Sequence, residues 1–152
     1  MSKFKNYFIS ILIPVIVGSI VGLIISKFID YDTLIKPFLA PPSILFPIMW
    51  TILYILMGIS YGILKDRNLT NSSIDFIYYS QLIINALWSI FFFVLKWRFF
   101  SIIWIIILAI FVLIMIIQFY KKNKLAGLLQ IPYILWTLFA AYLNIGFYVL
   151  NS

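Results

Sequence analysis

The chain has no cysteine and no histidine, and its only acidic residues are four aspartates. The absence of cysteine excludes disulfides and thiolate chemistry. The absence of histidine removes the commonest metal ligand and the commonest catalytic base. Neither the glycine pattern of a nucleotide-binding loop nor a cluster of metal-ligand residues is present. We therefore expect no metal site and no resident cofactor.

Charge of either sign is scarce. Only 10% of the residues are charged, while 65% are hydrophobic and 20% aromatic, and the mean hydropathy is +1.15. Soluble domains average roughly a quarter charged residues, so this composition is typical of a membrane protein. Lys and Arg give a net charge of +7, but they lie singly or in short runs between apolar segments. We interpret them as a topological signal, with no nucleic-acid partner.

Five stretches contain no charged residue: 7–26, 43–64, 76–95, 99–120 and 125–150. The length of each stretch is close to the roughly 20 residues that a helix needs to cross a bilayer. Because backbone groups in lipid must bond within their own segment, helices are the expected form. The first stretch has no A-x-A cleavage site, so we expect it to be retained as a span. The sequence predicts an all-α membrane protein, a single five-transmembrane-helix bundle over residues 1–152.

The basic residues predict an orientation. Counted by side, seven Lys and Arg accompany the N-terminus and the second and fourth loops, against four in the first and third loops. The positive-inside rule then places the N-terminus in the cytoplasm and the first loop outside. The expected location is a cell membrane, the plasma membrane of a bacterium.

The loops differ in length. Residues 96–98 and 121–124 are expected to form tight turns, whereas residues 27–42 form one long loop, which favours a functional role such as a lid. In the first span, Gly18 and Gly22 favour close helix packing, within the chain or between two copies. The fourth span is apolar all round, and we expect it to be the most lipid-exposed helix.

The second span carries an aromatic face. Pro41-Pro42 marks the end of the long loop, and Ser43 is the expected N-cap of the helix. A helical period then places five residues on one side: Trp50, Tyr54, Met57, Gly58 and Tyr61. This face could receive a flat apolar molecule.

Two further spans place tryptophan beside polar or small residues at helical spacing. They are the third, with Gln81, Asn85, Trp88, Ser89 and Phe92, and the fifth, with Tyr133, Trp136, Thr137, Ala140, Asn144 and Phe147. Trp50, Trp88 and Trp136 lie too deep for the interfacial belt, whereas Trp97 and Trp104 fit it. The buried amides have two interpretations that the sequence leaves open: hydrogen bonds between helices, or contacts to a ligand.

Three segments carry a family resemblance. KPFLAPPSILFPIMWTILYILMGISYG, QLIINALWSIFFF and IPYILWTLFAAYLNIGFYVLN resemble, in order and spacing, the second, third and fifth helices of the translocator protein (TspO/MBR) family, also called the tryptophan-rich sensory or peripheral benzodiazepine receptor family. The resemblance covers most of residues 36–151. It implies a five-helix bundle, often a homodimer in the lipid membrane, that binds porphyrins and other flat hydrophobic molecules in a pocket closed by the first loop.

The resemblance also implies ligand-binding residues, carried over by position: Tyr31, Trp50, Tyr54, Asn85, Trp88, Ser89, Trp136 and Ala140. Three departures from the family pattern stand out. Ile44 replaces the tryptophan that many members have after the double proline, Ile106 replaces an acidic residue of the fourth helix, and no Lys or Arg follows Tyr148 to complete a sterol motif.

Three functions follow from these expectations. The first is a membrane receptor or sensor for a tetrapyrrole-like ligand. The second is an enzyme that degrades porphyrin in light and oxygen, with Trp50 and Trp136 as the candidate redox residues and no other catalytic residue. The third is a transporter of tetrapyrroles or other lipophilic molecules, against which the lack of intramembrane charges and of internal repeats counts.

Overall fold

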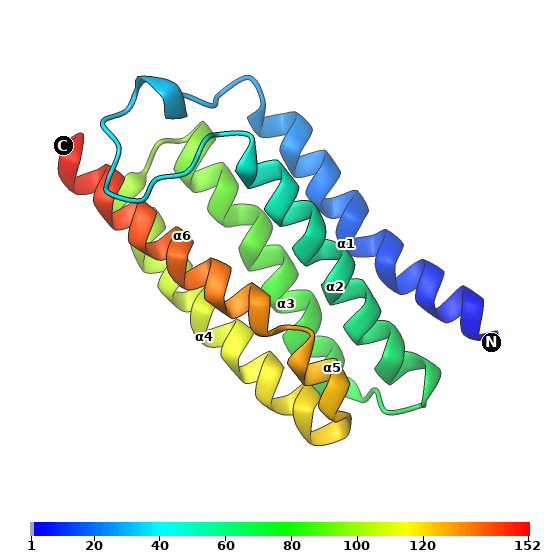
Figure 1. Cartoon of the computed structure of the whole chain (residues 1–152). Coiled ribbons are helices and arrows are strands. Elements are labelled where there is room, and N and C mark those ends of the chain that lie inside the picture. Colours follow the sequence, from blue (N-terminus) through cyan, green and yellow to red (C-terminus); the bar gives the residue numbers. More distant parts are fainter. Residues whose placement is uncertain (1) are drawn as a thin grey trace.

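The computed structural model describes residues 2–152, which are mainly helical, with one long loop between the first two helices and short connections elsewhere (Figure 1). The elements in order are α1 (Lys3–Ile25), a 3₁₀ turn η1 (Tyr31–Thr33), α2 (Leu45–Asp66), α3 (Ser72–Ser89), a π-helical turn η2 (Ile90–Val94), α4 (Arg98–Lys122), α5 (Lys124–Leu128) and α6 (Ile131–Leu150). Five segments are long and apolar enough to span a membrane: α1, α2, α3 with η2, α4, and α5 with α6. The predicted all-α membrane fold with five transmembrane helices is confirmed.

The bundle is built around α2 and α3, with α1 along one side and α4 and α6 along the other (Figure 1). The N-terminus and the turns that follow α2 and α4 lie at one end. The long loop, the α3–α4 turn and the C-terminus lie at the opposite end. We call these the N-terminal end and the loop end. The count of Lys and Arg by side of the membrane assumed this same grouping of the loops and the termini.

One expectation about a helix end was wrong. Ser43 does not cap α2, which begins at Leu45 after Ile44, and Ile44 makes no side-chain capping bond. The fifth span is interrupted, because α5 ends at Leu128 and α6 begins at Ile131. Pro132 occupies the first turn of α6, where its missing N–H costs no hydrogen bond, so the helix restarts there.

The expectation that the fourth span would be the most lipid-exposed helix was also wrong. Helix α4 packs against α3 and α6 and buries seven residues, among them Ile105, Leu108 and Phe119. Helix α1 buries only Asn6, Ser10 and Pro14. A uniformly apolar helix carries no periodic signal to show which side meets protein, so composition alone could not rank the two helices.

Among the glycines between α1 and α2, Gly58 permits the closest approach of one helix to the backbone of the other. A Cβ atom on Gly58 would lie 2.3 Å from the Cα of Ile11 and 2.7 Å from the carbonyl oxygen of Ser10. Both atoms belong to the backbone of α1, so they cannot move aside as a side chain would. Small residues permit this kind of backbone contact in membrane bundles.

Candidate functional site

A cavity of about 530 Å³ lies in the half of the bundle that the long loop caps. Its walls come from α1, the loop, α2, the junction of α3 with η2, and α6. The volume falls in the range of about 300–1,000 Å³ that small-molecule sites occupy. Five separate parts of the chain therefore enclose one space.

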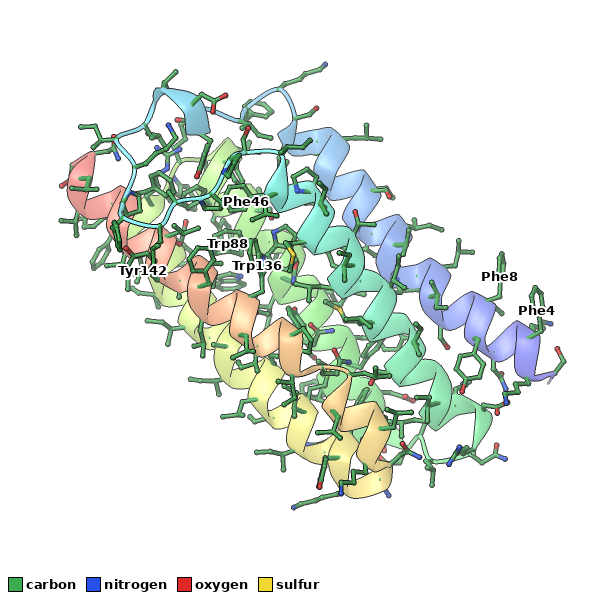
Figure 2. The ribbon with its side chains drawn as sticks, viewed as in Figure 1. Phe4, Phe8, Phe46, Trp88, Trp136 and Tyr142 are labelled. Atoms are coloured by element: carbon green, nitrogen blue, oxygen red, sulfur yellow. The ribbon has the colours of Figure 1, made fainter. Side chains whose placement is uncertain are left out.

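Three indoles dominate the cavity. The ring centroid of Trp50 on α2 lies 6.5 Å from that of Trp88 on α3 and 6.5 Å from that of Trp136 on α6. Figure 2 shows Trp88 and Trp136 inside the bundle together with Phe46, whereas Phe4 and Phe8 of α1 point away from it. Each indole comes from the helix face that the sequence period predicted.

Seven of the eight residues named from the resemblance line this cavity: Tyr31, Trp50, Tyr54, Trp88, Ser89, Trp136 and Ala140. Asn85 is not among the lining residues. It lies in the adjacent core, and only 2% of its surface is exposed. The structure therefore brings seven of them together around one space and places the eighth behind Tyr54.

Asn85 is the centre of a buried hydrogen-bond chain. The Tyr54 hydroxyl donates to Asn85 Oδ1 at 2.8 Å, and Asn85 Nδ2 donates to the Tyr133 hydroxyl at 2.7 Å. Tyr133 in turn donates to Gln81 Oε1 at 2.7 Å. Of the two interpretations left open, Asn85 and Gln81 follow the first, because their amides join α2, α3 and α6. Satisfied amides avoid a cost of several kcal/mol in hydrocarbon.

Asn144 forms hydrogen bonds between helices and also lines the cavity. It lines the cavity, its Oδ1 accepts from Trp88 Nε1 at 3.0 Å, and its Nδ2 donates to the carbonyl of Arg98 at 3.0 Å. The amide thereby holds the Trp88 ring in one orientation. It also ties α6 to the start of α4.

Some lining residues were not predicted as site residues. Phe46 lies one helical turn before Trp50, and its ring centroid is 5.9 Å from that of Trp136. The aromatic face of α2 could have been extended back by one turn to find it. The α1 wall, which includes Gly18 and Gly22, carried only a packing signal.

The long loop is fastened to the bundle at several points. Asp30 accepts from Arg98 at 2.7 Å and lies 3.8 Å from Lys96. Asn151 forms two hydrogen bonds of 2.9 Å with the backbone of Ile35, and Tyr142 donates to the carbonyl of Phe38 at 2.5 Å. These contacts hold the loop, which crosses the end of the bundle in Figure 1 and contributes Ile29 and Tyr31 to the cavity wall.

Tyr31 belongs to the loop and also lines the cavity. Its hydroxyl donates to the carbonyl of Pro41, so it closes the loop on itself. Burial, with a smaller contribution from the negative charge of Asp32, raises the pKa of the Tyr31 phenol. The hydroxyl therefore stays protonated and remains a donor at neutral pH.

The lining residues limit the chemistry that the cavity can perform. They include no Asp, Glu, Lys or Arg, and the polar groups are hydroxyls, one amide and indole N–H groups. Within residues 2–152, the indole nitrogen of Trp136 is buried without a hydrogen-bond partner. No group of three acidic, His or Cys residues that could hold a metal occurs in the same range. Such a site can bind by shape, stacking and a few hydrogen bonds.

Comparison with known proteins gives a consistent result. The model of the TspO/MBR family matches residues 10–150. The tryptophan-rich protein TspO of Archaeoglobus fulgidus is 42% identical over 77% of this chain and 76% of its own length. The tryptophan-rich sensory protein of Cereibacter sphaeroides is 32% identical over 75% and 72%, and the translocator protein homolog of Schizosaccharomyces pombe is 29% identical over 97% and 93%. The chain is a multi-pass membrane protein that belongs to the TspO/MBR family.

Proposed function

We propose that this protein is a membrane receptor or sensor that binds a tetrapyrrole or a similar flat hydrophobic molecule in the cavity between Trp50, Trp88 and Trp136. The observation that carries the proposal is the set of three indoles around one space of about 530 Å³ with no Asp, Glu, Lys or Arg in its wall. Flat conjugated rings stack on indoles, and membrane-soluble ligands match an apolar wall. The relatives' names, sensory protein and translocator protein, agree with a binding role.

The proposal extends to the assembly and the membrane. We expect a homodimer, with apolar faces that meet either the partner or lipid. We expect the membrane to be a bacterial plasma membrane. The enzyme alternative would use the same indoles, and the transporter alternative would use the same cavity. Neither alternative is supported by an Asp, Glu, Lys or Arg side chain among the residues that line the cavity.

Substitution of the cavity indoles tests the proposal. Trp50→Ala and Trp136→Ala should each weaken the binding of protoporphyrin about tenfold, because stacking on an aromatic ring contributes about 0.5–1.5 kcal/mol beyond burial. The measurement is a titration of purified protein, followed by tryptophan fluorescence. Trp97→Ala is the matched control, because Trp97 is 52% exposed and lies outside the cavity. Equal losses in all three variants would point to general destabilisation and would refute the proposed site.

The proposed orientation has its own test. We expect the N-terminal end in the cytoplasm and the loop end outside, and the absence of native cysteine makes labelling unambiguous. Asp32→Cys, in the exposed loop, should react with an impermeant thiol reagent in whole cells, whereas Ser72→Cys, exposed at the start of α3, should be protected. The reverse pattern would invert the orientation without affecting the five spans.

A further inference from the structure

The N-terminal end of the bundle contains a tyrosine pair that plays no part in the cavity. Tyr61 on α2 and Tyr78 on α3 stack with ring centroids 4.4 Å apart and planes inclined by 12°. Both side chains are buried. The Tyr61 hydroxyl donates to Asp75 Oδ1 at 2.6 Å, and Asp75 lies half-buried in the first turn of α3. A phenol thus donates a hydrogen bond to a carboxylate near the N-terminal end of the bundle.

Aromatic rings and the amide of Gln81 connect this pair to the cavity. The ring centroid of Trp50 lies 5.9 Å from that of Tyr54 and 6.4 Å from that of Tyr133. The Tyr133 hydroxyl donates to Gln81 Oε1 at 2.7 Å, and Gln81 lies one helical turn after Tyr78 on α3. Tyr78 then stacks on Tyr61. The oxidisable rings therefore form a line from the cavity toward the opposite end of the bundle.

The tyrosines of this line differ in the acceptor that each hydroxyl has. Tyr54 and Tyr133 donate to the amide oxygens of Asn85 and Gln81. The hydroxyl of Tyr78 has no partner within residues 2–152. Only Tyr61 donates to a carboxylate.

This difference decides where an oxidised tyrosine can persist. A phenol that loses an electron becomes a strong acid, so a neutral tyrosyl radical forms only where a base within hydrogen-bond reach takes the proton. An amide oxygen is a hydrogen-bond acceptor but a very weak base, whereas an ionised carboxylate accepts a proton readily. Oxidising equivalents that enter the line should therefore settle on Tyr61.

We propose that the line Trp50–Tyr54–Tyr133–Tyr78–Tyr61 carries oxidising equivalents out of the cavity and stores them as a tyrosyl radical at Tyr61, with Asp75 as the proton acceptor. The inference rests on the proposed function, because the oxidant is a photo-excited tetrapyrrole bound in the cavity. That ligand takes one electron from Trp50 and passes it to molecular oxygen, which becomes superoxide.

Tyr61 then repairs the oxidised Trp50. Tyr61 supplies one electron through the line to the Trp50 radical cation, which returns to indole. At the same time the phenolic proton of Tyr61 moves to Asp75 Oδ1, leaving a neutral tyrosyl radical and a protonated carboxyl group. A water-soluble reductant such as ascorbate or a thiol returns one electron, the proton moves back from Asp75, and Tyr61 is restored. The device would protect the cavity indoles from oxidation by their own ligand.

The test uses the whole protein and protoporphyrin. Binding is first measured by titration in the dark, and the complex is then illuminated in the presence of oxygen. Transient absorption and electron paramagnetic resonance, with ring-deuterated tyrosine for assignment, should detect a neutral tyrosyl radical in the unmodified protein. Tyr61→Phe should lose it while keeping the stacked ring. Asp75→Asn should lose it while keeping an acceptor for the Tyr61 hydroxyl.

In both variants the Trp50 indole radical should live about a hundredfold longer, the low end of what a positioned base contributes to a proton transfer. Tyr120→Phe is the control, because Tyr120 lies at the same end, is 45% exposed and forms no side-chain hydrogen bond within the described residues. A purely structural role for the Tyr61–Asp75 contact would lower the thermal midpoint without moving the radical lifetime.

The outcomes separate the two proposals. If protoporphyrin does not bind, the proposed function falls and this inference falls with it. If protoporphyrin binds but no tyrosyl radical forms, or the radical is unchanged in Tyr61→Phe, the inference alone is overturned. If Asp75→Asn does not fold, Tyr61→Phe still decides between these results.

Discussion

Gly58→Ala is expected to destabilise the protein although it adds a single methyl group. The new Cβ would lie 2.3 Å from Cα of Ile11, so α1 must move away from α2. Overpacking of this kind costs about 1–3 kcal/mol or more, which outweighs the gain of up to about 1 kcal/mol from replacing glycine in a helix. The thermal midpoint in detergent should fall by roughly 2–4 °C for each kcal/mol lost.

Gly22→Ala is the matched control on the same pair of helices. A Cβ at Gly22 meets no neighbouring heavy atom of the described chain within 4 Å. The substitution should therefore leave the thermal midpoint unchanged or raise it slightly. A Gly58→Ala protein as stable as the Gly22→Ala protein would show that α1 does not rest on Gly58.

Ala140→Phe is expected to give the largest loss of binding. Ala140 lines the cavity on α6, one turn after Trp136, and only 4% of its surface is exposed. A phenyl ring at this position occupies space that a flat ligand needs. Steric overlap of about 1–3 kcal/mol corresponds to an affinity reduced by roughly five- to a hundredfold. The measurement is the protoporphyrin titration, with the thermal midpoint recorded in parallel.

Leu138→Phe is the control for this substitution. Leu138 belongs to the same helix, is 54% exposed and does not line the cavity. Its replacement adds a ring of the same kind toward the lipid, and the affinity should not change. Unchanged affinity in Ala140→Phe would place the ligand outside the cavity described here.

The sequence was sufficient to predict those features that depend on local pattern. Charge-free stretches of about 20 residues predict membrane helices because the hydrocarbon core contains no water, so every segment that crosses it must be apolar and must satisfy its own backbone hydrogen bonds. The helical period placed Trp50, Trp88 and Trp136 on inward faces, because residues that are three or four positions apart lie on the same side of a helix.

Other features depend on contacts between distant residues and were not predicted. The loop is held by the pairs Ile35–Asn151 and Asp30–Arg98, and no local pattern links residues so far apart. The wall that α1 contributes to the cavity was not predicted either, because this helix has almost no amphipathic signal. Its position depends on how closely it packs on Gly58 of α2. The role of Asn85 does not follow from the sequence either, because an amide on an inward face can meet either a ligand or another helix.

The most direct test of the proposed site is to observe the five tryptophans separately. In protein with isotope-labelled tryptophan, each indole N–H gives one nuclear magnetic resonance signal, assigned by single Trp→Phe substitutions. Addition of protoporphyrin should shift the signals of Trp50, Trp88 and Trp136, because the ring current of a bound porphyrin acts over short distances. The signals of Trp97 and Trp104 should stay in place. Shifts at Trp97 or Trp104, with the three cavity indoles unmoved, would contradict binding in the cavity.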